Sequence, residues 1–479
     1  MGDHRVALQL IMQITIINGE YTDASGEIRN AYPVNLVPVP KVQGISRGYL
    51  KPAEGILLKG SGPGIDRGGI NWDGVLHRVM GSKLVRIDSN YNLTVLGDVG
   101  AETTPVTLHY SFDRLAIAAG TRLYYWNGAV LSQVTDIDLG VVVDMIWIDG
   151  YFMTTDGTSL IVTDLGNPMS VNPLKYGSSE IDPDRVVGLL GLYNEVYALN
   201  RYTTEIFQNV GGSLFPFARV PGAQIRKGCV GTYAKCILDD SICFVGSGRN
   251  EPIAIYVARN SESLRISSRD IEQTLAGYTE AELSMIKIEA KYNEAQHHLL
   301  VHLADRTLVY DVTASKATEQ PVWHQLTTNL SDFSAYRGRN LVWVYDAWQC
   351  GDPSSPQYGT LSGVESNHYG LPVRWEFSVP IIYNDSRGAI VHSLELVSLT
   401  GLEAPALSRP SMSTAYSNDG IVFSQEKSIA TSVAGERGKR LVWRQQGFFR
   451  NFRIQRFRGD SFSKLTFIRL EAEIEPLGA

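Results

Sequence analysis

Residues 75–87, VLHRVMGSKLVRI, have a strand, turn, strand pattern in which Gly81, Ser82 and Lys83 separate two short apolar segments. The same order of segments recurs at residues 115–126 and 151–163. Runs of five to eight residues rich in Val, Ile, Tyr and Trp, with turn residues between them, fill most of residues 75–350. This pattern predicts an all-β structure.

The predicted hairpin turns recur at a nearly regular interval. Their mean separation is about 44 residues, which is typical of β-propeller blades built from several short strands. The turns lie near residues 81, 120, 156, 202, 247, 304 and 346. We therefore predict a β-propeller of six or seven blades; a large β-sandwich array or a β-solenoid is the alternative that the period leaves open.

One segment, residues 268–283, breaks the strand pattern. Ser268 precedes apolar residues at helical spacing, and Thr279 is followed by Glu282 in the order of a capping box. Two short helices on a long connection between blades are predicted here.

The composition changes after Asp352, where Pro, Ser, Gly and Asn are concentrated up to about Gly370. Long alternating segments without a helical pattern follow from Val373 to Glu475, which fits a β-sandwich of the jelly-roll kind. The predicted division is an N-terminal strand or arm over residues 1–30, the propeller over 31–365 and a C-terminal β-sandwich over 366–479.

The overall composition excludes several classes of protein. The chain has 479 residues, of which 44% are hydrophobic and 19% charged, and this excludes a wholly disordered chain or a coiled coil. The net charge of −7 argues against a protein that mainly binds nucleic-acid backbone. Four cysteines are too few for a disulfide scaffold. We expect no signal peptide and no membrane association, because the apolar runs are short and interrupted.

No catalytic, cofactor or metal motif stands out in the sequence. His298 and His302 are four residues apart, but on a strand they start about 13 Å apart, so no metal site is predicted. The closely spaced cysteines are predicted to be buried, and paired aspartates occur only in turn-like segments, where Asp commonly bonds to local backbone. These residues are Cys229, Cys236 and Cys243, and the pairs Asp136/Asp138, Asp182/Asp184 and Asp239/Asp240. The chain is predicted not to be an enzyme and to need no cofactor.

The sharpest charge feature lies between Arg437 and Arg458, which contains eight Lys or Arg, no acidic residue and five interleaved aromatic residues. The favoured interpretation is a pair of strands whose aromatic side chains face inward and whose arginines face outward or meet an acidic neighbouring subunit. Tracking of a nucleic-acid strand is the alternative. Candidate interface residues come from this segment and from one predicted inter-blade loop: Arg440, Arg444, Arg450, Arg453, Arg456, Arg458, Phe215 and Phe217.

Several short blocks follow one another in a characteristic order along residues 30–460. They are YPVNL (32–36), GYL (48–50), GI (55–56), DGT (156–158), IVTDL (161–165), RKGCVGTY (226–233), IEQTL (271–275), YTEAEL (278–283), LVYD (308–311), Trp323, CGD (350–352), YGL (369–371) and LVWR (441–444). In this order the blocks resemble the packaged-DNA stabilisation proteins, which are tail accessory factors of short-tailed bacteriophages. The resemblance departs in the first 20 residues and in the loops around residues 400–415.

The resemblance implies a structural protein of the virion tail, synthesised in the cytoplasm of a bacterial host. It implies docking on the portal-bound adaptor, closure of the head after DNA packaging, and a platform for the tail needle and the tailspikes. A ring of six copies is expected, through which DNA passes without sequence-specific binding. A glycan-binding or glycan-cleaving tail protein and a DNA-binding portal plug are the competing hypotheses.

Overall fold

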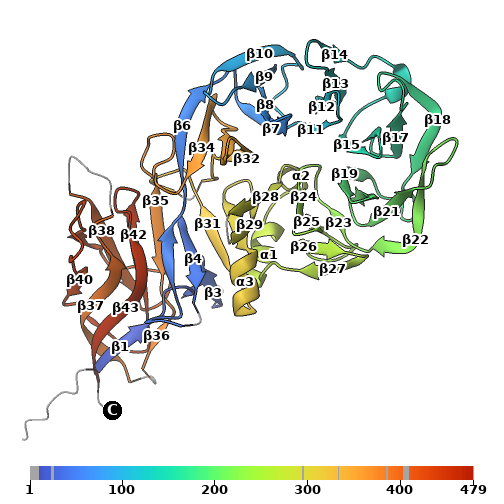
Figure 1. Cartoon of the computed structure of the whole chain (residues 1–479). Helices are drawn as coiled ribbons and strands as arrows, with labels where there is room; N and C mark the ends of the chain where they lie inside the picture. The colour runs from blue at the N-terminus through green and yellow to red at the C-terminus, as the bar shows by residue number, and fades with distance from the viewer. Residues whose placement is uncertain are drawn as a thin grey trace, which may run out of the picture.

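The protein consists of a ring of β-sheets and a smaller β-sandwich beside it (Figure 1). The computed structural model describes residues 10–22, 26–41, 43–293, 296–332, 334–384, 387–402 and 409–477. Nearly all of its regular structure is β-strand, so the predicted all-β class is confirmed. No helix within these ranges has the length and apolar character needed to span a bilayer.

The ring is a β-propeller, and seven blades can be traced in the described residues. Strands are given from the innermost outward. The first blade contains β7 (Asp66–Trp72), β8 (Val75–Met80), β9 (Lys83–Ile87) and β10 (Leu93–Asp98), and the second contains β11 (Thr107–Tyr110), β12 (Leu115–Ala119), β13 (Arg122–Trp126) and β14 (Leu131–Gln133). The third contains β15 (Asp144–Ile148), β16 (Tyr151–Thr155), β17 (Ser159–Thr163) and β18 (Val171–Ser178), and the fourth contains β19 (Val186–Leu192), β20 (Glu195–Asn200), β21 (Thr204–Asn209) and β22 (Phe217–Ile225). In the fifth blade, β23 (Gly228–Cys229) and β24 (Lys235–Leu238) both pair with β25 (Ser241–Ser247), which is followed by β26 (Ala254–Arg259) and β27 (Glu262–Arg265). The sixth blade contains β28 (Lys287–Asn293), β29 (Gln296–His302), β30 (Thr307–Asp311) and β31 (Trp323–Leu326). The seventh contains β32 (Arg339–Val344), β33 (Ala347–Gly351), β34 (Gln357–Ser362) and β6 (Gly55–Ser61). Innermost strands of neighbouring blades lie side by side, and β32 returns to β7 (Figure 1).

The last blade is completed by a strand from the beginning of the chain. β6 pairs antiparallel with β34, with Gly55 opposite Ser362 and Ser61 opposite Gln357. Backbone hydrogen bonds therefore close the ring. The segment 352–356, where the change in composition predicted the approach to the domain boundary, is the loop between β33 and β34 inside this blade.

A buried polar network stabilises the closed ring of blades where the first, sixth and seventh blades meet. Arg78 donates to Asp66 at 2.9 Å, and neither side chain is exposed. The Asn340 side chain donates to Asp66, and its backbone carbonyl accepts from Arg78. Glu289 of β28 accepts the backbone N–H groups of Asn340 and Leu341. A buried charge is tolerated only when it is paired and hydrogen-bonded, so each member of this network depends on the others.

The second lobe is a sandwich of two sheets. The seven-stranded sheet contains β4 (Leu36–Pro40), β5 (Gly48–Pro52), β43 (Thr466–Pro476), β37 (Ala389–Leu399) and β40 (Val442–Arg444), with β1 (Leu10–Ile14) on β43 and β41 (Phe448–Phe449) on β37. The five-stranded sheet contains β35 (Arg374–Ser378), β42 (Phe452–Asp460), β38 (Ser411–Ser417) and β39 (Lys427–Ala430), with β36 (Ile382–Tyr383) on β42. The aromatic rings of Phe377, Phe457 and Phe467 pack together between the sheets.

The N-terminal part of the chain runs through the sandwich. β4 and β5 pair with each other, β5 reaches β43, and β1 pairs with β43. The predicted division placed residues from 31 onward in the propeller, and the strand pairing differs because Leu36 and Leu50 are buried in the sandwich core. The boundary at residue 365 stays a prediction, and residues 1–9 and 23–25 of the predicted arm lie outside the described residues.

Residues 33–35 join the two lobes through backbone hydrogen bonds. The Val34 N–H donates to the Glu376 carbonyl at 2.8 Å, and the Asn35 N–H donates to the Gln325 carbonyl at 2.9 Å. The reciprocal bonds run from Glu376 to Val34 and from Gln325 to Pro33. The outer strand of the sixth blade is thus continuous, through this segment, with the five-stranded sheet of the sandwich.

Asn35 also holds this joint with its side chain. Its amide nitrogen donates to the carbonyls of Thr327 at 3.0 Å and Arg374 at 2.6 Å, and its amide oxygen accepts the Thr327 N–H at 3.0 Å. The residue is 6% exposed and has φ = 52°, a left-handed conformation that Asn adopts more readily than most residues. Asn35 therefore meets both the polar and the conformational demands of the joint.

The two predicted helices are present between the fifth and sixth blades. They are α1 (Arg269–Ala276), capped by Ser268, and α2 (Glu280–Ser284), where Thr279 and Glu282 form the predicted capping box. The helix α3 (Val312–Thr318) and the short 3-10 helix η1 (Ile137–Leu139) were not predicted. α3 begins at Asp311, whose side chain accepts the Ala314 N–H, a single cap that the surrounding strand pattern masked.

Because three histidines are buried, we expect the free energy of unfolding to fall in mild acid. Burial lowers the pKa of His302 to about 4 and the pKa values of His324 and His368 to about 3. The unfolded value is about 6.5, so below that pH the unfolded chain binds more protons than the folded chain, and the free energy of unfolding falls as the pH falls. Each histidine contributes a loss of about 1 kcal/mol between pH 6.5 and 5.5.

Urea unfolding at several pH values measures this loss. His324→Gln should reduce the drop between pH 6.5 and 5.5 by about 1 kcal/mol. The control is His392→Gln, because the His392 side chain is 35% exposed and pairs with Glu475 at the surface. An unchanged drop in the His324 variant would contradict the assignment.

Candidate assembly surfaces

The six arginines predicted as an interface do not lie on one surface. Arg440 precedes β40, Arg444 is its last residue, and Arg450 follows β41; β40 and β41 both pair with β37. All three are exposed. Arg440 forms an ion pair with Glu395 of β37, whereas no ion pair is found for Arg444 or Arg450 within the described residues.

Two other members lie on the outer face of the five-stranded sheet. Arg456 and Arg458 alternate on β42 with the buried Phe457, and both approach Glu426, at 3.9 and 2.5 Å. The Arg456 guanidinium also lies 3.9 Å from the ring centroid of Phe423. These two cations therefore share one carboxylate of their own chain, and Arg456 also packs on an aromatic ring of that chain.

Arg453 is not a surface residue, which corrects the prediction. It is 0% exposed, because on β42 it has the inward orientation of Gln455 and Phe457. Its Nε donates to Gln455, its Nη1 donates to the Gln446 carbonyl at 2.7 Å, and its guanidinium lies 3.9 Å from the Tyr416 ring centroid. Burial lowers the pKa of Arg453 to about 10. The alternation of the strand, applied residue by residue, separates Arg453 from Arg456 and Arg458.

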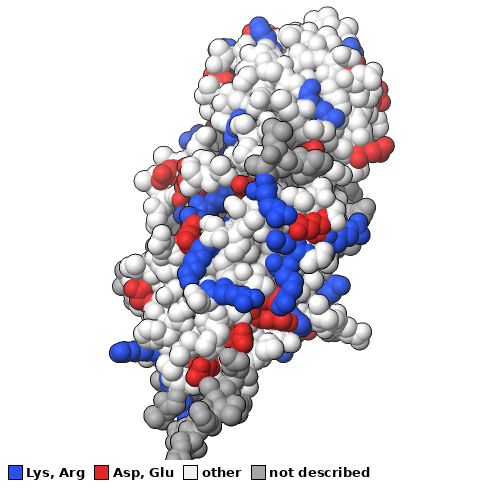
Figure 2. Space-filling view, turned by 90° about the vertical axis from the view of Figure 1, so that its left-hand side faces the viewer, with Lys and Arg blue, Asp and Glu red and all other residues white. Residues whose placement is uncertain are grey.

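Four basic residues without an ion pair in the described part of the chain follow the edge of the seven-stranded sheet. We call them the basic edge: Arg437, Lys439, Arg444 and Arg450. Phe448 of β41, on the same edge, is 54% exposed. Figure 2 views the molecule from the left of Figure 1 and shows Lys and Arg gathered over the sandwich, with acidic side chains between them.

The two phenylalanines predicted for an inter-blade loop differ in exposure. Phe217 begins β22, is 4% exposed and packs in the core between the third and fourth blades. Phe215 is half-buried, and its ring lies 5.9 Å from that of Phe217. Phe217 is therefore a core residue, and only Phe215 can offer part of its ring to a partner.

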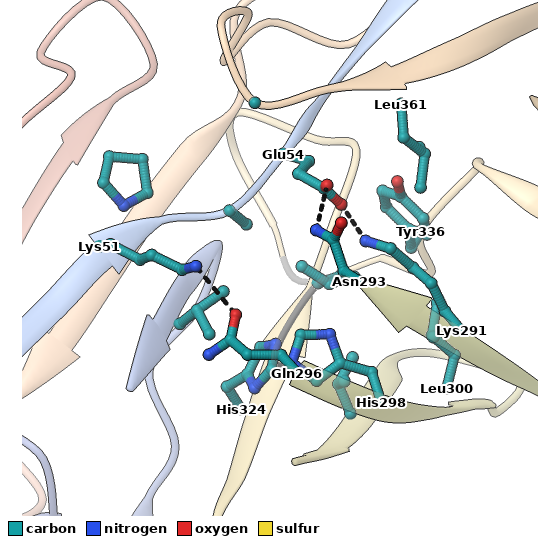
Figure 3. A pocket seen from close by; sticks show the side chains of 16 residues that line it. Lys51, Glu54, Lys291, Asn293, Gln296, His298, Leu300, His324, Tyr336 and Leu361 are labelled. Atoms are coloured by element: carbon teal, nitrogen blue, oxygen red, sulfur yellow. Dashed lines mark hydrogen bonds and ion pairs between the residues drawn. The ribbon is translucent and has the colours of Figure 1, made fainter. Parts of the chain in front are cut away.

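A cavity of about 180 Å³, lined by polar and apolar side chains, lies between the sixth blade and β5 of the sandwich (Figure 3). Lys51 of β5 donates to Gln296 at 2.8 Å, and Glu54 accepts from both Lys291 and Asn293 (Figure 3). These contacts connect the two lobes. The charge of Lys291 is balanced by Glu54. The contacts that line the cavity therefore add to the joint formed at Asn35.

The paired aspartates of the predicted turns accept backbone N–H groups or form ion pairs. The N–H groups of Val171 and Asp138 lower the pKa of Asp136, and Asp184 accepts the N–H groups of Tyr202 and Thr203. Asp239 pairs with His297 and Lys316. A general acid in glycoside hydrolysis needs a raised pKa and access to substrate, and these side chains act instead as turn caps and ion-pair partners.

The closely spaced histidines form hydrogen bonds within the sheet, and the closely spaced cysteines are buried or half-buried. His298 and His302 lie on β29, where His298 bonds to Asp311 and His302 to Thr307. Cys229 and Cys243 are buried strand residues, and Cys236 is half-buried. Within the described ranges, no group of three or more His, Cys, Asp or Glu side chains is arranged to hold a metal ion.

The surface position of the basic edge predicts that it can be altered without unfolding the protein. Arg444→Glu with Arg450→Glu should change the free energy of unfolding by no more than about 0.5 kcal/mol, because both side chains are exposed and neither forms an ion pair with a described residue. Arg440→Glu should cost about 1 kcal/mol, because it places a carboxylate beside Glu395. Chemical denaturation of the variants measures both values; a large loss in the double variant would contradict its surface assignment.

Two family profiles match most of the chain. The profile described as "Bacteriophage P22 Gp10, beta-propeller" matches residues 12–365, and the profile "Bacteriophage P22 Gp10, beta-sandwich" matches residues 374–475. The chain is also similar to the tail hub protein gp10 of Salmonella phage P22, with 27% identity over 462 residues, covering 92% of this chain and 94% of that protein.

Solved structures of other proteins are similar only at a low level. The N-terminal domain of Nup159 has a TM-score of 0.40 and 8% identity, covering 69% of this chain and 98% of that one. The Cps50 (Swd1) β-propeller domain of Myceliophteria thermophila has a TM-score of 0.40 and 10% identity, covering 64% of this chain and 99% of that one. At these values the likeness carries no argument about function.

Proposed function

Because the chain belongs to the bacteriophage P22 Gp10 family of phage tail hub and stabilisation proteins, we propose that it closes the filled phage head after DNA packaging and retains the genome. It is a structural component of the virion tail. The observation that carries the proposal is the extent of the match: the similarity to the P22 tail hub covers 94% of that protein and includes both lobes.

The proposed partners are the other parts of the tail. The chain docks on the portal-bound adaptor and provides a platform for the tail needle and the tailspikes. Six copies form a ring, and packaged DNA passes through it without sequence-specific binding. The rigid joint at residues 33–35 and Asn35 supports this role, because a hub that bears load must keep its two lobes in a fixed relation.

The basic edge is proposed as one of the two surfaces that close the ring. A ring of identical subunits needs two different, complementary surfaces on every copy. Arg437, Lys439, Arg444 and Arg450 lack an ion pair in the described part of their own chain, so their charges are available to an acidic neighbour. Arg453 is excluded from this role by its burial.

A binding experiment with filled heads tests the proposed role. Purified chain is mixed with DNA-filled heads that carry the connector but lack this protein, and the bound protein is located by electron microscopy. We expect binding at the single tail vertex only. A chain that ignores this vertex and binds or cleaves host surface polysaccharide would contradict the proposal and support the glycan-directed alternative.

A further inference from the structure

One face of the propeller is formed by the turns between the first and second strands of the blades. We call it the turn face. All these turns lie on the same side, because every blade repeats the same up-and-down strand order around one axis (Figure 1). The turns with described residues are 73–74, 111–114, 149–150, 193–194, 239–240 and 345–346; that of the sixth blade lies outside the described residues.

Aromatic side chains are exposed along an arc of the turn face. Phe112 is 98% exposed, Tyr193 68% and Trp343 50%. Phe112 packs edge-on against Trp147 of the next blade at 6.0 Å, and Trp343 packs against Trp348 at 5.5 Å. Exposed aromatic groups of this kind mark protein contact surfaces, because they supply a large apolar area with little conformational freedom to lose.

Carboxylates without an ion pair in the described part of the chain lie in turns of the same face. They belong to exposed turn residues of four blades: Asp73, Asp149, Asp240 and Asp346. The lobes also differ in overall charge. Residues 55–362 contain 24 Lys or Arg and 33 Asp or Glu, whereas the rest of the chain contains 19 and 17. The turn face is therefore an acidic, aromatic surface on the more acidic lobe.

We propose that the turn face of one copy binds the basic edge of the next copy. The inference rests on the ring of the proposed function and identifies its second surface. Four cations and four carboxylates for which the described residues supply no ion pair face each other in this contact, together with the exposed Phe448 on the edge and the exposed aromatic arc. β40 lies on the side of the sandwich away from the propeller (Figure 1), so the edge serves a neighbouring copy rather than its own turn face. The contact is head-to-tail, as a closed ring requires.

Two propeller variants test the acidic and aromatic parts separately. The acidic variant combines Asp73→Asn, Asp149→Asn and Asp346→Asn; Asn is chosen because φ is 53°, 48° and 54° at these positions. The aromatic variant combines Phe112→Ser with Tyr193→Asn. Sedimentation of the purified full chain should show self-association weakened about tenfold in each, with a reduced salt dependence only in the acidic variant.

Matched controls change the opposite face of the propeller. Asp156→Asn, Asp182→Asn and Asp305→Asn remove three carboxylates there, and Val141→Ser with Met285→Ser removes two apolar side chains that are 49% and 56% exposed. Neither control should change self-association. Thermal melting of every variant verifies that it is folded.

Mixing two defective variants gives the sharpest test. One variant carries Arg444→Glu and Arg450→Glu on the edge, and the other carries the acidic turn-face changes. At a concentration where the wild-type chain associates but a tenfold weaker association is largely lost, each variant alone should be mostly monomeric, whereas the mixture should form heterodimers, because one intact edge and one intact turn face remain available. No complex in the mixture, or a wild-type chain that stays monomeric, would overturn the inference. Rings that tolerate the turn-face changes would overturn it too, while leaving the proposed head closure standing.

Discussion

Arg78→Met is expected to lower the free energy of unfolding of the propeller by about 3–5 kcal/mol. The substitution keeps much of the side-chain volume but removes the cation that faces Asp66 at 2.9 Å, where both side chains are 0% exposed. It also removes the donor to the Asn340 carbonyl. A buried carboxylate left without its partner is far more costly than the loss of a surface charge, and this one lies where the first and last blades meet. Chemical denaturation measures the loss.

Two matched substitutions separate this effect from the general loss of a basic residue. Lys83→Met breaks the exposed pair with Asp98, where the side chains are 40% and 53% exposed, and should cost less than about 1 kcal/mol. Arg453→Met removes a buried arginine that has no carboxylate partner in the described residues, so it leaves no carboxylate unpaired and should cost clearly less than Arg78→Met. Equal losses for all three variants would contradict the account of the closure.

Asn35→Ala is expected to cost about 3–4 kcal/mol and to uncouple the two lobes. The substitution removes three buried hydrogen bonds to Thr327 and Arg374 and places a residue with a Cβ but no amide at φ = 52°. Because residues 33–35 connect the sixth blade to the five-stranded sheet, loosening them should let the sandwich melt separately. Calorimetry should therefore show one main transition for the native chain and two for the variant.

Two controls divide the Asn35 effect into its parts. Asn35→Gly removes the same side-chain bonds without conformational strain and should recover about 1 kcal/mol relative to Ala. Asn250→Ala tests strain alone, because Asn250 has φ = 62° on an exposed turn. A single transition in Asn35→Ala, with a loss no larger than in Asn250→Ala, would show that the joint does not couple the lobes.

The repeat of the blades could be predicted from the sequence, because each blade contains a turn with recognisable local turn residues. The turns near residues 81, 120, 156, 202, 247 and 304 each join the second and third strands of a blade, so their spacing reports the blade length. The mark near 346 lies instead between β32 and β33. The equivalent turn, at 352–356, was interpreted as part of the domain boundary, because its Pro and Ser content is as typical of an inter-domain segment as of a turn.

The non-local pairings were not readable in the same way. β6 completes the seventh blade almost 300 residues before its partner β34, and β1, β4 and β5 belong to a sheet whose other strands begin at residue 389. Local patterns identify strands but not distant partners. The blade count therefore stayed at six or seven, and the predicted propeller began at residue 31, before β4 and β5, which pair within the seven-stranded sheet of the sandwich.

The candidate surfaces were predictable only in part. The charge of the segment from Arg437 to Arg458 is plain in the sequence, but its division into an exposed edge, a paired outer face and the buried Arg453 depends on which strands neighbour it. The turn face was missed, although a signal was present: an aromatic residue precedes an Asp-Gly turn at Trp72 and again at Trp147, and Phe112 lies in a turn itself. The sequence alone does not show that these turns lie on one face of the propeller.

The DNA content of phage particles assembled with and without this protein tests head closure most directly. The account predicts that heads assembled without the chain fill with DNA and then lose it, and that adding the purified chain before the loss preserves the genome. Heads that remain full without the chain, and fail only to attach to the host, would contradict it.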